Sequence, residues 1–304
     1  MKNLKDIIVE RLHINKDTGN HRNHHYNYHP KTRIELKELV DQLIKERGNE
    51  ANLNDIDTSE IKDMSYMFKS SEFNGDISEW YVSNVEYMID MFGESKFNGD
   101  ISNWNVSNVK DMNGMFFRSK FNGDISNWDV NNVKNMSYMF CGTSFNGDIS
   151  KWDVSKVKDM SSMFESSEFN GDISNWDVSN AEEMYCMFYG SMFNGDISNW
   201  DVSNVKDMES MFYRSKFNGD ISKWDVSKVE DMSFMFGNSS FTGENGDISN
   251  WDVSNVINME RMFQYSEFNG NISKWDVSNV KNMSDIFYDS PLEKNPPKWY
   301  KYYK

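Results

Sequence analysis

Hydrophobic positions recur along this chain with a period of 24 residues. Every gap between successive Trp residues is 24, apart from one gap of 27. These tryptophans are Trp80, Trp104, Trp128, Trp152, Trp176, Trp200, Trp224, Trp251, Trp275 and Trp299. A Met-x-x-Met-Phe box repeats in the same phase. A fixed period of this length is the signature of an architecture in which each repeat is one structural unit.

The order of polar and apolar positions within one repeat predicts its local structure. In the copy at residues 193–216, an Asn-Gly pair indicates a turn, because both residue types tolerate positive φ. Residues 197–202 carry β-forming Ile, Trp and Val and predict one short parallel strand or extended segment. Ser203 is predicted to cap a short helical segment, because Val, Met, Met and Phe follow over residues 205–212 at spacings of three and four.

One such unit cannot bury its Ile, Trp, two Val, two Met and two Phe alone, so successive copies must cover one another. The predicted fold is therefore a repeat solenoid with one short strand and one short helical segment in each turn. Leu53 and Leu292 keep the phase of the array, which is predicted to span residues 53–304 as about ten repeats. A three-residue insertion lies near 242–245.

Residues 1–52 differ in composition from the repeats and are predicted to form an N-terminal helical cap. A helix is expected at Arg33–Arg47, because Thr32 and Glu35 form a capping box and Gly48 is a good terminator. A second, short amphipathic helix is expected between Leu4 and Leu12. Solenoids need their first turn covered, which favours a cap; a separate docking or targeting segment is the alternative.

All five histidines lie between these two predicted helices: His13, His21, His24, His25 and His29. Their spacing would allow metal ligation if the stretch were helical. The stretch is rich in Asn, ends in Pro30 and contains no Cys, Asp or Glu between residues 20 and 30. A solvated loop is therefore the preferred interpretation, and metal binding the alternative.

The formal charge of −16 argues against a nucleic-acid partner, because that affinity comes from Lys and Arg neutralising phosphates. The longest apolar run near the start is Ile7-Ile8-Val9, too short for a signal peptide or a membrane span. The expected location is the cytoplasm, with a cell surface or a virion as alternatives. Cys141 and Cys186 lie at different phases of repeats two turns apart and are expected to be free thiols.

The box V-x-x-M-x-x-M-F, followed by x-x-S-x-F-N-x-D-I-S-x-W-D-V-S, resembles the BspA-like leucine-rich repeat proteins, and specifically their DUF285 branch. The resemblance covers residues 53–304. It implies a right-handed leucine-rich-repeat-type solenoid of bacterial or phage origin. Members of the family are often described as surface or adhesion proteins, and the resemblance implies no catalytic residues.

No catalytic or phosphate-binding motif occurs, and every repeated polar residue is copied along the array. We therefore expect no enzyme and no cofactor, but a non-catalytic protein-protein interaction or structural scaffold, with adhesion or host interaction as one possible use. The copies differ most after Met-Phe, and loops commonly carry function. The candidate binding residues are Phe117, Arg118, Tyr189, Tyr213, Arg214 and Tyr265. The partner and the oligomeric state are not encoded in any recognisable motif.

Two columns of aspartates suggest an alternative, a calcium-stabilised ligand-binding surface. One column comprises Asp76, Asp100, Asp124, Asp148, Asp172, Asp196 and Asp220; the other comprises Asp129, Asp153, Asp177, Asp201, Asp225, Asp252 and Asp276. The repeat lacks the glycine-rich nonapeptide of calcium β-rolls, and Tyr81 and Asn105 interrupt the second column. Hydrogen bonding of Asp to backbone N–H groups is the preferred interpretation, and no metal ligands are assigned.

Overall fold

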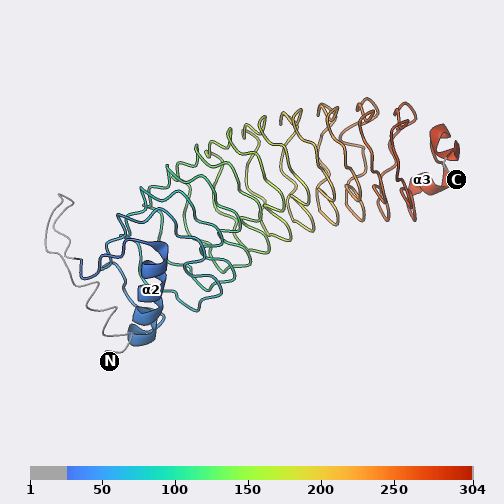
Figure 1. Cartoon of the computed structure of the whole chain (residues 1–304). Helices are drawn as coiled ribbons and strands as arrows, with labels where there is room; N and C mark the ends of the chain where they lie inside the picture. Colours follow the sequence, from blue (N-terminus) through green and yellow to red (C-terminus); the bar gives the residue numbers. More distant parts are fainter. Residues whose placement is uncertain (1–25, 303–304) are drawn as a thin grey trace.

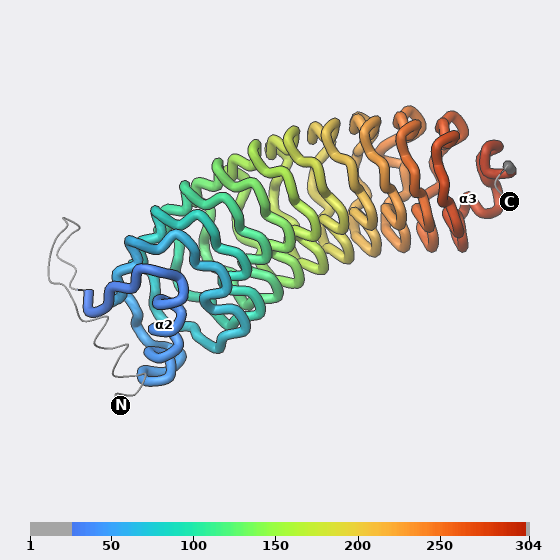
Figure 2. Tube along the Cα trace, in the orientation of Figure 1, coloured from blue at the N-terminus to red at the C-terminus, as the bar shows by residue number. Residues whose placement is uncertain are grey.

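The computed structural model describes residues 26–302, which wind into an elongated coil of stacked turns (Figures 1 and 2). Helix α2, Arg33–Arg47, lies against the first turns, whereas α3, Pro291–Lys294, and the 3-10 helix η1, Lys298–Tyr302, lie at the other end. The coil between them has no helix in the described residues. The predicted helix from Leu4 to Leu12 lies outside these residues, as do four of the histidines.

A single core runs the length of the coil and is built from residues that repeat. Phe188 and Phe193 of one turn stack at 4.5 Å between ring centroids, and each also stacks on its equivalent in the next turn, Phe212 and Phe217, at 5.7 and 6.5 Å. The Val and Met residues of each repeat join this cluster almost without exposure. Each turn thus buries the apolar surface of its neighbours, as the stacking of repeats requires.

The tryptophans tie successive turns together through their indole N–H groups. Trp200 Nε1 donates to the carbonyl of Ile173 in the preceding turn at 3.1 Å. The backbone N–H of Trp176 donates to that same carbonyl at 3.2 Å. The pattern recurs at all ten tryptophans, including Trp251, which donates across the insertion to Ile221 at 3.2 Å. A buried indole needs a partner, and here the fold supplies one in every turn.

The predicted helical segment is wrong. Over residues 208–214, alternate backbone N–H groups donate to the next turn, as Ser210 does to Ser233 at 2.8 Å. The intervening N–H groups close tight turns, as Met211 does to Met208 at 3.2 Å. Ser210 and Arg214 have φ of 55° and 56°, so the stretch is a series of turns with left-handed residues. An α-helix would satisfy these N–H groups within the segment, whereas here half of them link neighbouring turns.

The structure also has no strand at residues 197–202, where the sequence predicts one. The parallel pairing between turns in the described residues consists of isolated bridges, and in the coil most of these lie at the residue before each box, as between Asp207 and Asp231. Residues 197–205 instead form two turns, closed by Trp200 N–H to Ile197 and Val205 N–H to Val202. Ser203 is not a helix cap; its N–H donates to the Asp201 carboxylate at 3.0 Å.

The Asn-Gly pair forms a corner, but not through positive φ. Gly195 is absent from the left-handed residues of the chain. A Cβ at Gly195 would lie 2.8 Å from the Phe193 ring, which folds back over it. The Asn194 N–H donates to the side-chain oxygen of Asn170 at 2.8 Å, and this ladder continues from turn to turn. Glycine is therefore required for close approach of the buried ring.

Helix α2 has the bounds that the sequence predicts. Thr32 Oγ1 accepts from the Glu35 N–H at 3.2 Å, the Glu35 carboxylate accepts from the Lys31 N–H, and Gly48 ends the helix with φ of 90°. Its buried residues are Leu36, Leu39, Val40 and Leu43, and they belong to the same core as the coil. At the other end, Trp299 and Tyr300 pack on Phe287 of the last box. Both ends of the core are thereby covered.

The hand of the coil and its assignment to the leucine-rich-repeat type remain predictions. The pairing of residues 24 apart is a property of the structure itself, since bridges join Asp63 to Tyr87 and so on to Asn282.

Candidate functional site

Large variable side chains line one edge of the coil, at the left-handed positions of the turns and the residues beside them. We call this set the aromatic strip. It comprises Phe117, Arg118, Tyr138, Tyr185, Tyr189, Tyr213, Arg214, Phe234, Arg261, Tyr265 and Tyr288. In other turns the same positions hold mostly Ser, Gly, Asp, Glu or Asn; the first turn adds a separate pair, Tyr66 with Lys69, whose ammonium lies 5.5 Å from the ring.

The central part of the aromatic strip is a continuous stack. The rings of Tyr189 and Tyr213 lie 5.1 Å apart at 26°, and the Arg214 guanidinium lies 5.3 Å above the Tyr213 ring. The edge of the Phe234 ring meets Tyr213 at 6.0 Å, and the Arg261 guanidinium lies 5.6 Å from Phe234. Five side chains from four successive turns thus hold one another in place.

A second group begins nearer the N-terminus. The Arg118 guanidinium lies 5.0 Å from the Phe117 ring, and Phe117 meets Tyr138 edge-on at 6.4 Å. The Tyr138 hydroxyl is 3.2 Å from the hydroxyl of Tyr185, two turns further along. Tyr185 belongs to the same turn as Tyr189. This hydroxyl contact therefore spans the turn in which the strip has only serines at its left-handed positions.

The structure brings five of the six predicted binding residues into these two groups. The pairs are Phe117 with Arg118, and Tyr189 with Tyr213 and Arg214. Tyr265 contacts Tyr288 instead, with ring centroids 5.4 Å apart at 89°, and both are about half exposed. It forms the end of the strip near the C-terminus.

Sequence reasoning missed five members of the strip: Tyr138, Tyr185, Phe234, Arg261 and Tyr288. Four of them lie inside the Met-x-x-Met box, where a helix was expected. Only the variable stretch after Met-Phe had been considered, and Tyr288 occupies that stretch in the last box. The available signal is that an aromatic residue or Arg replaces Ser, Asp or Gly at an interior box position in five turns, including the first, which holds Tyr66.

The aspartate columns serve the backbone. The Asp196 carboxylate accepts from the N–H of Ser198 at 2.9 Å, and this pattern recurs in each turn of its column. These hydrogen bonds stabilise the charged form and hold the pKa of Asp196 below its ordinary value. Within residues 26–302, no three His, Cys, Asp or Glu side chains are grouped so as to hold a metal ion.

A third set of acids lies at the residue that forms the backbone bridge between turns or just after it. The pKa values of these acids are raised rather than lowered. The pKa of Asp207 is raised, first by burial and also by the nearby charge of Asp231. The pKa values of Glu183 and Glu209 are raised by burial and by neighbouring carboxylates as well. This side of the coil therefore brings several carboxylates close together, with Glu183 and Asp207 partly buried and Glu209 exposed.

Both cysteines are free, with Cys141 buried and Cys186 half-buried. Burial, and then the charge of Glu165, raises the pKa of each thiol to about 12. At neutral pH both are thiols, which are poor nucleophiles and poor metal ligands.

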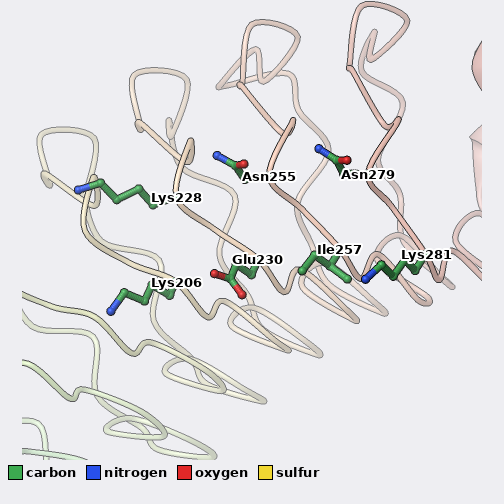
Figure 3. A pocket seen from close by; sticks show the side chains of 7 residues that line it. All are labelled: Lys206, Lys228, Glu230, Asn255, Ile257, Asn279 and Lys281. Carbon is green, nitrogen blue, oxygen red and sulfur yellow. The ribbon is translucent and has the colours of Figure 1, made fainter.

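A second surface feature, which we call the lysine groove, is an open depression along turns near the C-terminal end (Figure 3). It is lined by Lys206, Lys228, Glu230, Asn255, Ile257, Asn279 and Lys281. Figure 3 shows these side chains in two rows, one with Lys228 and the two asparagines, and one from Lys206 to Lys281.

These features define a repeat protein in which stacked 24-residue turns carry variable side chains along their edges. Four overlapping segments, residues 35–144, 118–218, 141–245 and 191–300, match the family described as "Mycoplasma protein of unknown function, DUF285". The chain belongs to this family. No curated protein and no solved structure matches it. No helix in the described part of the chain is long and apolar enough to cross a membrane.

Proposed function

We propose that the protein is a non-catalytic scaffold that binds a protein partner through the aromatic strip. The observation that supports this most directly is the continuous stack from Tyr189 to Arg261, held together on a solvent-facing edge. The core is built from other side chains, which repeat almost without change, and the strip residues join the turns through their backbone N–H groups, whatever their side chains. The strip residues are therefore free to vary for recognition.

The geometry of the strip favours a protein partner. The ring of Tyr213 packs against Tyr189, Arg214 and Phe234, so its hydroxyl end remains for contact with a partner. A sugar ring requires an open aromatic face, which this stack does not offer at Tyr213. Tyr and Arg are the residue types that dominate protein-protein interfaces. Because the stack already fixes these side chains, binding costs little further conformational entropy.

The finer classification belongs to the same proposal. A right-handed leucine-rich-repeat-type solenoid of the BspA-like kind, used in adhesion or host interaction, would present such an edge to a partner over several turns. The repeated 24-residue turn and the covered ends of the core support this classification. The proposal includes neither a catalytic role nor a bound calcium ion.

The test compares partner recovery by the tagged wild-type protein and by Tyr213→Ala and Arg214→Ala variants, using proximity labelling and quantitative mass spectrometry. Loss of one anchor residue should reduce recovery of the specific partner by about tenfold or more. Lys223→Ala, an exposed residue of the next turn outside the strip, serves as the control. Equal recovery by all four proteins, with unchanged thermal midpoints, would refute the proposal.

A further inference from the structure

The lysine groove is built where two rows of the repeat depart from their usual residues. The first row normally holds Asn, whose amide donates to the preceding turn, as Asn255 does to the Ser227 carbonyl at 2.7 Å. Lys228 replaces this Asn. The second row holds a charged residue in all the remaining turns. Here it holds Ile257, which is 38 % exposed. Both departures fall within adjacent turns of one depression (Figure 3).

The charges of the groove are only partly neutralised. Lys228 donates to the neutral side-chain oxygen of Asn204 at 2.6 Å. Lys206 shares the Glu182 carboxylate, at 2.8 Å, with Lys158. Among the described residues, no carboxylate lies within ion-pair distance of Lys228 or Lys281, although Asp225 interacts electrostatically with Lys228. Glu230 is the one acid that lines the groove, and it interacts electrostatically with Lys206. A positive depression of this kind stands out on a chain whose net charge is −16.

We propose that the lysine groove binds an extended acidic peptide segment with a carboxylate near each end and an aliphatic side chain between them. Lys206 with Lys228 receives one carboxylate, and Lys281 the other. Ile257 contacts the aliphatic side chain. Asn255 and Asn279 use their amide nitrogens on the preceding turns, which leaves their side-chain oxygens to accept peptide N–H groups.

The chemistry of the groove disfavours other anionic ligands. No aromatic side chain lines it, so it offers no platform for stacking a sugar or a base. A polyphosphate carries more negative charge than a peptide with two carboxylates, so the net negative charge of the chain repels it more strongly. Ile257 has no role for a purely polar ligand but fits an aliphatic residue.

The spacing of the rows sets the length of the peptide. Turns paired as parallel strands lie about 4.8 Å apart, so Ile257 is about 10 Å and Lys281 about 15 Å from Lys206 along the row. An extended peptide advances about 3.3 Å per residue. Successive side chains of an extended peptide point to opposite faces, so the three that reach the groove must be alternate residues. The aliphatic residue should therefore follow the first acid by two residues and the second acid should follow the first by four, a span of about 13 Å that the long Lys and Glu side chains extend to the groove length.

The probe is a fluorescein-labelled, end-capped peptide, Glu-Ser-Leu-Thr-Glu, together with its reversed sequence. Binding to the full chain is measured by fluorescence polarisation at low ionic strength. One of the two directions should bind with a Kd below about 1 mM, and added salt should weaken it. The same peptide with Gln in place of both Glu residues should bind at least several-fold more weakly.

Variants that restore the usual residue of a row test the site without endangering the fold. Lys228→Asn should weaken binding about two- to fivefold, and the charge reversal Lys281→Glu about tenfold. The matched control is Lys156→Asn, because Lys156 makes the same bond to Asn132, at 2.8 Å, in a turn outside the groove. This control should bind the peptide like the wild-type protein. Ile257→Gln should weaken binding of the leucine peptide but not of a version with Ser in place of Leu.

The proposal is overturned if neither peptide direction binds, if the Gln peptide binds as well as the Glu peptide, or if Lys156→Asn weakens binding as much as Lys228→Asn. Tyr213→Ala, in the aromatic strip, should leave peptide binding unchanged. Failure at one surface is therefore distinguishable from failure at the other.

Discussion

At the scale of single residues, each turn places two residues in the left-handed region of backbone conformation, four positions apart. Most of these are not glycine; their φ angles run from 49° at Arg118 to 63° at Tyr66. Each such residue costs on the order of 1 kcal/mol. The cost is offset because these residues donate their N–H groups to the next turn, as Ser162 does to Tyr185 at 2.9 Å and Ser166 to Tyr189 at 2.7 Å.

Gly114→Ala tests this geometry directly. Gly114 has φ of 60° inside a Met-x-x-Met box, and a Cβ there would lie 2.7 Å from the Asp90 carboxylate. We expect the variant to lose about 1 kcal/mol of stability, measured as a lower thermal or urea midpoint. In an α-helix the same change would instead gain nearly that amount.

The complementary change is Ser162→Gly, at the same box position two turns later, where φ is 54°. This variant should be as stable as the wild-type protein or slightly more stable, because glycine adopts this conformation without strain. If Gly114→Ala raised the midpoint and Ser162→Gly lowered it, the left-handed turns would be wrong.

At the scale of elements, helix α2 covers the first turn of the coil with four buried residues, in the place where a preceding turn would otherwise lie. Leu39→Ala should cost about 2–5 kcal/mol, the usual range for a buried Leu in a packed core. Since turns in a repeat array contact only their neighbours, the loss should be local. Hydrogen exchange should accelerate in residues 53–92 and remain slow in residues 190–240. Uniform acceleration along the whole coil would contradict this expectation.

The same scale shows which elements a sequence can predict. Helix α2 was predictable because its signals are local: Thr32 and Glu35 at one end, Gly48 at the other, and an apolar stripe between them. The 24-residue period and the buried Val, Met, Phe and Trp positions were predictable because each is repeated. The turns of the box were not, since their apolar spacing of three and four also fits a helix. Among the described boxes, only the one with Gly114 has a glycine at its left-handed position. Glycine is also rare at the left-handed position after Met-Phe.

The aromatic strip was only half predictable for a related reason. Tyr138, Phe234 and Arg261 reach the strip because a left-handed residue projects outward beside the stretch after Met-Phe. The lysine groove depends on two rows that are two residues apart in sequence and become a depression only through stacking over several turns.

At the scale of the whole molecule, two sets of carboxylates give stability opposite dependences on pH. Asp196 and its column have lowered pKa values, so their contribution is present above the ordinary Asp value and is lost as pH falls through the folded pKa. Glu183, Asp207 and Glu209 have raised pKa values, so theirs is present at low pH and is lost as pH rises through the folded pKa. Stability should therefore peak near about pH 5.

The thermal midpoint measured between pH 3 and pH 8 checks this expectation, and two Asp→Asn variants separate the two sets. Asp207→Asn should flatten the fall on the neutral side, whereas Asp196→Asn should reduce the fall on the acid side. The chain already has Asn at an equivalent position of each set, Asn135 for Asp207 and Asn271 for Asp196. Each accepts the same backbone hydrogen bond. A midpoint that decreases steadily from pH 8 to pH 5 would contradict the expectation.

The bond from each indole to the preceding turn has a consequence for how such a chain can change over generations. Trp251 reaches Ile221 across three extra residues, so a turn may lengthen at its corner while its contacts stay in step. The backbone bridges of the coil join equivalent positions of neighbouring repeats. Loss or duplication of one whole repeat in the gene, a frequent error when near-identical stretches of DNA misalign during copying, would thus leave all remaining links intact. The reach of the molecule, and the sequence of side chains along its edge, can be shortened, extended or reshuffled by the same slip that would destroy an ordinary globular fold.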